Sequence, residues 1–218
     1  VYAIVAPAGS QGLPGTWQFL AENKTPMWGP ISPADPKQAE VYLLSATRAA
    51  QDSVAIDYFA KKGAKRLAVI KQDNDLGVSA KQALDAQMPK HPDMQVVADE
   101  NTATGSTEVS SAVNKVVAAQ PDAVLLAEDN TSTALILKQL RAQGFTGMVF
   151  ADQGAGGTGG PSTVGPAGEA AEGFLGGMQA DTVSTNNPAV EHWRELAKKS
   201  GKPQAESGFS LQTYSFVK

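Results

Sequence analysis

Short hydrophobic segments alternate with amphipathic segments along most of the chain. The hydrophobic segments have the length and composition of strands, and we expect strands at 1–7, 26–32, 41–46, 65–70 and 94–99. The amphipathic segments repeat apolar residues at helical spacing, which predicts helices at 16–23, 52–62, 78–88, 107–119 and 186–201. The stretch 121–154 combines a strand, a polar loop, an amphipathic helix and a second strand. This alternation is typical of an α/β fold with a doubly wound parallel sheet.

Individual residues indicate where these helices begin, end and bury one face. Glycines at the left-handed position are expected to end three helices, at Gly63, Gly144 and Gly201. Thr107 is placed to cap the helix that follows it. In the 52–62 helix, Val54, Tyr58 and Phe59 are spaced to share one buried face.

Polar residues follow both hydrophobic strands of the 121–154 stretch. Glu128 and Asp129 come directly after the first strand, and Asp152 and Gln153 come directly after the second. The carboxyl ends of parallel strands meet at one edge of a sheet, and small ligands bind at that edge in open α/β folds. These four side chains are therefore the first candidates for ligand contacts.

Composition narrows the classes of partner. A chain of 218 residues with 42% hydrophobic and 18% charged residues can form one large core or two modest ones. Its formal net charge of −4 disfavours a nucleic-acid or anionic-membrane partner. No apolar segment approaches the roughly 20 residues that span a bilayer, so we expect no direct membrane insertion. The lack of cysteine removes disulfides, zinc thiolates and thiol catalysis.

Motifs for cofactors and metals are weak. The segment 154–159 has the glycine spacing of a dinucleotide-binding loop, but Pro161 and Pro166 stand where the phosphate-binding helix would begin. We therefore expect a loop there and no cofactor. His91 lies in a predicted loop and His192 within a predicted helix, so we expect both to be solvated and no metal site to form.

Several longer segments occur in an order that matches a known family. In chain order they are VYAIVAPAGSQG, TPMWGPISPAD, YFAKKGAKRLAVIKQDNDLG, STEVSSAVNKVVAAQPDAVLLAED and LKQLRAQGFTGMVFADQG. Over essentially all 218 residues, their order and spacing resemble the type I periplasmic substrate-binding proteins, in particular those of branched-chain amino-acid ABC importers. The resemblance implies a two-lobed α/β fold, each lobe a doubly wound parallel sheet with helices on both faces.

The same resemblance implies how the chain is divided. Lobe I would comprise 1–45 and 179–218, and lobe II would comprise 46–178. It also implies that N-terminal and C-terminal portions of such a protein lie outside this sequence, so that lobe I is incomplete here.

By the resemblance, lobe I would hold the carboxylate of a ligand. Ser10 takes the position of the hydroxyl that binds it, and Gln11 lies beside it in the same loop. The backbone groups at Ser32, Pro33 and Ala34 would bind the same carboxylate. Backbone N–H groups with a hydroxyl form an anion pocket without a formal positive charge. The alternative for Ser10 is a helix cap.

In lobe II the resemblance implies contacts from Asp75, Leu76, Asp129 and Gln153. Leu76 stands where the family has an aromatic residue, and Gln153 stands where it has the carboxylate that meets a ligand ammonium. Asp129 could supply the missing negative charge, in which case the ligand is still an amino acid. Without it, a carboxylate or a polar neutral ligand fits better. The alternative for Asp75 and Asp129 is a turn or cap role.

The expected function is therefore that of an extracytoplasmic solute-binding protein. It would close on a small amino acid or carboxylate, act as a monomer and deliver its ligand to a membrane ABC permease. One alternative is the ligand-sensing domain of a receptor or regulator with the same fold. A second is an enzyme that uses Asp129 and Asp152 as a carboxylate pair for general acid and base catalysis. We expect no enzymatic activity, because the sequence offers no nucleophile, metal cluster or cofactor anchor.

Overall fold

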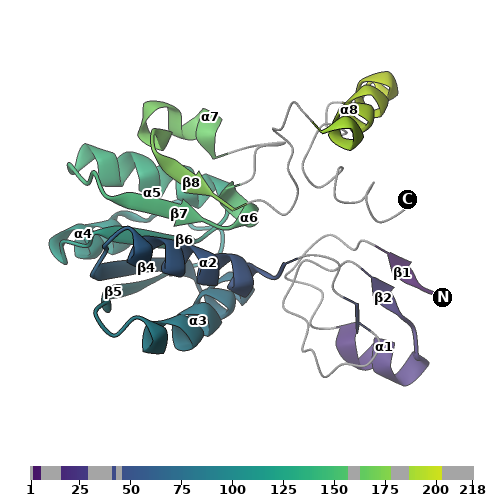
Figure 1. Cartoon of the computed structure of the whole chain (residues 1–218), viewed down its shortest axis with the longest axis horizontal. Helices are drawn as coiled ribbons and strands as arrows, with labels where there is room; N and C mark the ends of the chain where they lie inside the picture. Colours follow the sequence, from purple (N-terminus) through teal and green to yellow (C-terminus); the bar gives the residue numbers. More distant parts are fainter. Residues whose placement is uncertain are drawn as a thin grey trace. The chain divides into compact units, whose positions relative to one another are not determined.

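The chain forms two compact units (Figure 1). Unit 1 comprises Val1–Arg48 and Gln179–Lys218, and unit 2 comprises Ala49–Met178. The computed structural model describes residues 2–5, 16–28, 41–42, 46–156, 163–177 and 187–202.

Unit 2 contains a five-stranded sheet in which every adjacent pair is parallel. Its strands are β4 (Arg66–Gln72), β5 (Gln95–Thr102), β6 (Ala123–Ala127), β7 (Met148–Ala151) and β8 (Phe174–Gly176). The order across the sheet is β5-β4-β6-β7-β8, so the chain moves to one side of β4 first and then to the other. The direction in which successive strands are added to the sheet therefore reverses between β4 and β6. Ligands bind at this point of reversal in doubly wound sheets.

Helices cover both faces of this sheet (Figure 1). They are α2 (Arg48–Lys61), α3 (Asp75–Gln87), η2 (Met88–Lys90), α4 (Ser110–Ala118), α5 (Asn130–Ala142), α6 (Gln153–Gly156), α7 (Val164–Ala167) and η3 (Gly168–Ala171). On one face, α2 and α3 pack onto a core that contains Phe59 and Leu125. On the other face, α4 and α5 pack onto a second core that contains Leu126 and Leu137. The predicted α/β fold with a doubly wound parallel sheet is confirmed.

The central strand β6 is buried along its whole length, and none of its residues is more than 1% exposed. Strands flank it on both sides and helices cover both of its faces, which explains an unbroken apolar sequence in place of alternation. Consecutive side chains enter the two cores, as Leu125 and Leu126 do.

The buried face of α2 differs from the predicted one. Phe59 is fully buried, but Val54 is 68% exposed and Tyr58 is 40% exposed. The buried face instead contains Ala55 and Ile56. Three apolar residues at helical spacing are compatible with more than one buried face of a helix.

Helix ends agree with the sequence in part. Left-handed glycines end three helices as predicted, with φ of 88° at Gly63, 81° at Gly144 and 64° at Gly201. The prediction that Thr107 caps a helix is wrong. Helix α4 begins at Ser110, and its first N–H donates to Glu108 Oε1 at 3.0 Å.

The described part of unit 1 is smaller. It contains a parallel sheet in the order β1-β2-β3, with β1 (Ile4–Val5), β2 (Met27–Trp28) and β3 (Val41–Tyr42), and the helices α1 (Trp17–Asn23) and α8 (Pro188–Ser200). Leu20 and Met27 form its core, with Ile4, Trp17 and Val41 packed against them. No helix in the described parts of either unit is long and apolar enough to cross a membrane.

Gly77 allows α3 to lie directly against the end of β4. A Cβ at this position would clash with the backbone carbonyl oxygen of Gln72, which cannot move without moving the strand. We expect Gly77→Ala to lower the free energy of unfolding by about 2 kcal/mol, as overpacking in a core does. Urea denaturation would measure this loss. Gly165→Ala is the matched control, because nothing lies within 4 Å of a Cβ there, and it should be neutral or slightly stabilising. Equal stability of the two variants would contradict the prediction.

Candidate functional site

Polar side chains meet at the carboxyl ends of β4, β5 and β6, where the strand order reverses. Gln72 and Thr102 are register partners on β4 and β5. Glu128 follows Ala127 on β6, and Ala127 pairs with the residue before Gln72. Gln72, Thr102 and Glu128 are all buried. They form a row across three strands, which we call the polar row.

Hydrogen bonds connect the polar row to the loops that follow the strands. Thr102 Oγ1 donates to Glu128 Oε1 at 2.6 Å. Gln72 Nε2 donates to Asp129 Oδ2 at 2.6 Å, and Gln72 Oε1 accepts from Asn74 Nδ2 at 2.8 Å. These bonds join the loops after β4 and β6, so the edge of the sheet is held together by side chains as well as by the strands.

Asp129 is the N-cap of α5. Its Oδ1 accepts from the backbone N–H groups of Thr131 and Ser132 at 2.8 and 2.9 Å, which places negative charge at the positive end of the helix dipole. Its Oδ2 accepts from Gln72 and, at 3.4 Å, from the hydroxyl of Ser132. Both oxygens are already hydrogen-bonded, so a ligand ammonium would have to share them.

Glu128 is the member of the polar row with an unusual protonation equilibrium. Burial raises the pKa of Glu128 from 4.5 to about 7, while the polar groups of Thr102 and Gln72 oppose this rise and the charge of Asp129 adds to it. The side chain is only 1% exposed. Its second oxygen, Oε2, is buried and has no hydrogen-bond partner among the described residues.

A pocket of about 380 Å³ lies beside this network. Its lining residues are polar ones and glycines from the segments that follow β5, β6 and β7: Gly105, Ser106, Asp129, Asn130, Thr131, Ser132 and Gly154. The first turn of α5 therefore forms one wall of the pocket, and Asp129 fixes that turn.

The predicted site residues fall into three groups. Asp129 lines the pocket, and Gln153 directly precedes Gly154 of the lining. Leu76 is 8% exposed and belongs to the core under α3, while Asp75 begins that helix. The remaining predicted residues lie outside the described ones: Ser10, Gln11, Ser32, Pro33 and Ala34.

Gln153 is held in place through its backbone. Its N–H donates to Gln51 Oε1 at 3.1 Å, and its side chain is buried with no hydrogen-bond partner for Nε2 among the described residues. It begins α6, a single turn where the sequence predicted a loop. Asp152 explains this turn, because its Oδ1 accepts from the N–H of Gly154 at 2.6 Å.

Sequence reasoning did not select Gln72, Thr102 or Ser106 as part of the site. The available signal was position, since Gln72 and Thr102 are the last residues of β4 and β5, where these strands reach the carboxyl edge of the sheet. Asp129 and Asp152, the pair considered for acid and base catalysis, both accept hydrogen bonds from backbone N–H groups at helix starts. In the described parts of the chain, no group of three or more acidic or histidine side chains could hold a metal ion.

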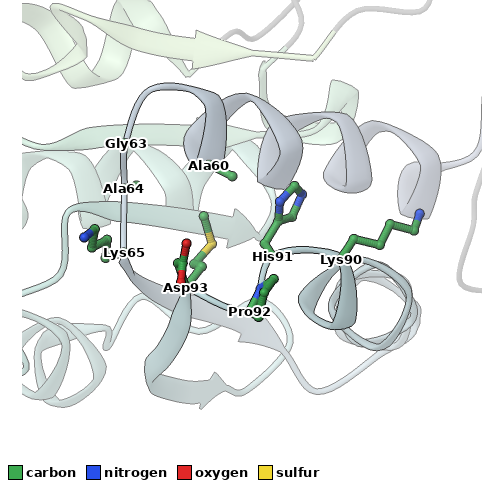
Figure 2. A pocket seen from close by; sticks show the side chains of 9 residues that line it. Ala60, Gly63, Ala64, Lys65, Lys90, His91, Pro92 and Asp93 are labelled. Carbon is green, nitrogen blue, oxygen red and sulfur yellow. The ribbon is translucent and has the colours of Figure 1, made fainter.

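A second pocket of about 310 Å³ lies at the opposite, amino-terminal edge of the sheet (Figure 2). It lies between the end of α2 and the loop that leads into β5, and Lys65, His91 and Asp93 are among its lining residues. His91 Nε2 lies 2.6 Å from Asp57 Oδ1, so the prediction of a freely solvated His91 is wrong. His192 is exposed, as predicted.

Comparison with known families identifies the chain. A family model described as periplasmic binding protein matches residues 1–218. The chain belongs to the periplasmic binding protein family. No curated protein sequence matches it.

Solved structures with the same fold are distant in sequence. This periplasmic binding protein is similar to a leucine-binding protein from Thermotoga maritima, with 23% identity, a TM-score of 0.79 and coverage of 100% of this chain and 62% of that one. It is also similar to an extracellular ligand-binding receptor from Rhodopseudomonas palustris HaA2, with 22% identity, a TM-score of 0.82 and coverage of 99% and 62%.

A third structure is a putative branched-chain amino-acid ABC transporter protein from Rhodospirillum rubrum, with 20% identity and a TM-score of 0.71. The match covers 88% of this chain and 56% of that one. The chain thus spans less than two thirds of the length of these relatives, which have the fold that the sequence resemblance implied.

Proposed function

We propose that this periplasmic binding protein is the extracytoplasmic solute-binding component of an ABC importer. It closes two lobes on a small amino acid or another small carboxylate-bearing molecule and presents the closed form to a membrane permease. Unit 1 and unit 2 correspond to lobe I and lobe II. The observation that carries the proposal is the polar row, which stands at the topological switch point of unit 2 beside a pocket of about 380 Å³.

The side chains at this site do not favour a ligand ammonium group, because the carboxylate of the pocket lining is engaged in other hydrogen bonds. Asp129 already caps α5 and accepts from Gln72. Gln153, which directly precedes Gly154 of the pocket lining, is neutral, and its buried Nε2 has no hydrogen-bond partner among the described residues. An amide donor suits a carboxylate or carbonyl oxygen, because leaving such a donor unpaired costs about 1–3 kcal/mol. A carboxylate or a polar neutral group therefore fits the unit 2 wall best.

Mass spectrometry of the purified protein, together with a thermal-shift screen, tests this function. L-leucine, benzoate and succinate represent amino acids, aromatic acids and dicarboxylates. We expect one class to raise the melting temperature as its concentration rises and to be recovered unchanged after incubation, because a ligand that binds only the folded state stabilises it. Conversion of the bound compound, or no co-purifying compound and no shift in any class, would contradict the proposal.

Variants at the two edges of the unit 2 sheet test where the ligand binds. Gln153→Ala should weaken the affinity for the active compound by roughly 3- to 10-fold, the cost of one neutral hydrogen bond. Lys65→Ala is the matched control, because Lys65 lines the pocket at the opposite edge. Calorimetry would compare the two variants. An effect of Lys65→Ala equal to that of Gln153→Ala would place binding elsewhere.

A further inference from the structure

The buried acid Glu128 shares a neighbour with Asp129. Gln72 Oε1 accepts from Asn74 Nδ2, which fixes the amide so that Nε2 faces the acids. An amide nitrogen carries two hydrogens, and Asp129 Oδ2 takes one of them at 2.6 Å. Glu128 directly follows β6, the strand next to β4, so it stands beside Gln72 at the carboxyl edge of the sheet.

The two acids differ in how their charges are compensated. Asp129 accepts two N–H groups of α5 through Oδ1. Glu128 accepts only the Thr102 hydroxyl through Oε1, and its Oε2 has no partner in the described parts of the chain. Burial therefore raises the pKa of Glu128 to about 7, and it holds a proton under mildly acidic conditions.

Charged side chains on the neighbouring strands β4 and β5 are paired, whereas Asp75 at the start of α3 has a buried Oδ2 with no hydrogen-bond partner among the described residues. Glu100 of β5 pairs with Lys115 of α4 at 2.8 Å. Lys71 of β4 pairs with Asp99 of β5. Asp152, after β7, accepts from the N–H of Gly154. Asp129 is thus the charge that acts on Glu128, and no cation among these groups compensates Glu128 when it ionises.

We propose that Glu128 is a positioning residue that makes the wall of the ligand pocket respond to pH. When Glu128 loses its proton, its unpartnered oxygen draws the Gln72 amide away from Asp129. Asp129 then holds the first turn of α5 less firmly, and Thr131 and Ser132 of the pocket lining move with it. The assignment of this pocket to a ligand rests on the proposed function, but the linkage itself requires no ligand.

The linkage is testable by NMR of the ligand-free protein. We expect the Glu128 side-chain carboxyl ¹³C resonance to titrate with a midpoint near the pKa of about 7. The amide protons of Thr131 and Ser132 should shift with the same midpoint. The amide of Ser110, which donates to Glu108 in α4, is the internal control and should not share that transition. Because no ligand is present, this result is independent of the proposed function.

Substitution of Glu128 separates the linkage from a purely structural role. Glu128→Gln keeps the acceptor for Thr102 and resembles the protonated acid, so the transition of Thr131 and Ser132 should disappear. Glu169→Gln, at an exposed side chain, should leave it intact. A Glu128 midpoint near the reference pKa of 4.5, or Thr131 and Ser132 resonances that do not follow Glu128, would overturn the proposal. Both of these outcomes are measured on the wild-type protein, so the proposal can be tested even if Glu128→Gln fails to fold.

Discussion

Replacement of Asp129 by alanine is expected to lower the free energy of unfolding by about 3 kcal/mol. The loss of a helix cap costs about 1 kcal/mol, and a buried amide left without its acceptor costs about 1–3 kcal/mol. Both costs apply here, because Asp129 caps α5 and also accepts from the buried Gln72. Urea denaturation near neutral pH measures the effect.

Two other substitutions separate these contributions. Asp129→Asn keeps one side-chain oxygen to accept the N–H groups of Thr131 and Ser132, so it should lose about 1 kcal/mol. Asn187→Ala removes the cap of α8, whose Oδ1 accepts from Ala189 at 3.0 Å, and should also lose about 1 kcal/mol. If Asp129→Ala lost no more than Asn187→Ala, Asp129 would not be committed to Gln72 and would be available to pair with a ligand ammonium.

Glu128→Gln is expected to remove a loss of stability that the wild-type protein undergoes as pH rises. The pKa of Glu128 is about 7 in the folded protein against a reference value of 4.5. The folded state therefore binds the proton more tightly than the unfolded state does. The stability that comes from this tighter proton binding is fully present below pH 4.5, the reference pKa. It is lost as the pH rises through the pKa of about 7 in the folded protein. Between about pH 5 and about pH 8 this loss amounts to roughly 2–3 kcal/mol.

Urea denaturation of both proteins at the two ends of this range tests the expectation. The difference in free energy of unfolding between Glu128→Gln and wild type should shift in favour of the variant by that amount at the higher pH. Any constant effect of the substitution cancels in the comparison. Glu169→Gln, at an exposed position, should differ from wild type by less than about 0.5 kcal/mol at both ends. Parallel pH profiles for Glu128→Gln and wild type would show that Glu128 does not carry this linkage.

The sheet of unit 2 was predictable because its physical cause is local. A parallel strand covered on both faces needs an unbroken apolar segment, and β6 is such a segment. Glycines at helix ends were predictable for the same reason, since a left-handed backbone at Gly63 is a requirement of a single residue. The buried face of α2 was not predictable from the sequence. Whether Val54 or Ile56 is buried depends on how the helix packs against the neighbouring sheet.

The candidate site was predictable only where chain neighbours form it. Asp129 follows a strand directly, and the sequence alone indicates that it reaches the carboxyl edge. Gln72 and Thr102 become side-by-side partners only through the pairing of β4 with β5, and Gln72 reaches Asp129 only because β6 lies on the other side of β4. The raised pKa of Glu128 likewise depends on burial among these strands, which no local pattern encodes.

The division of the chain into units has a consequence for how the protein forms. Unit 2 is one continuous segment, Ala49–Met178, whereas unit 1 joins two segments that lie on either side of it in the sequence. Bringing the ends of a long intervening chain together costs entropy before any contact can compensate, and that cost falls on unit 1. A folded unit 2 shortens the effective loop between those segments. During synthesis from the N-terminus, unit 2 should therefore fold first. The first segment of unit 1, Val1–Arg48, can complete its unit only after Gln179–Lys218 has been synthesised.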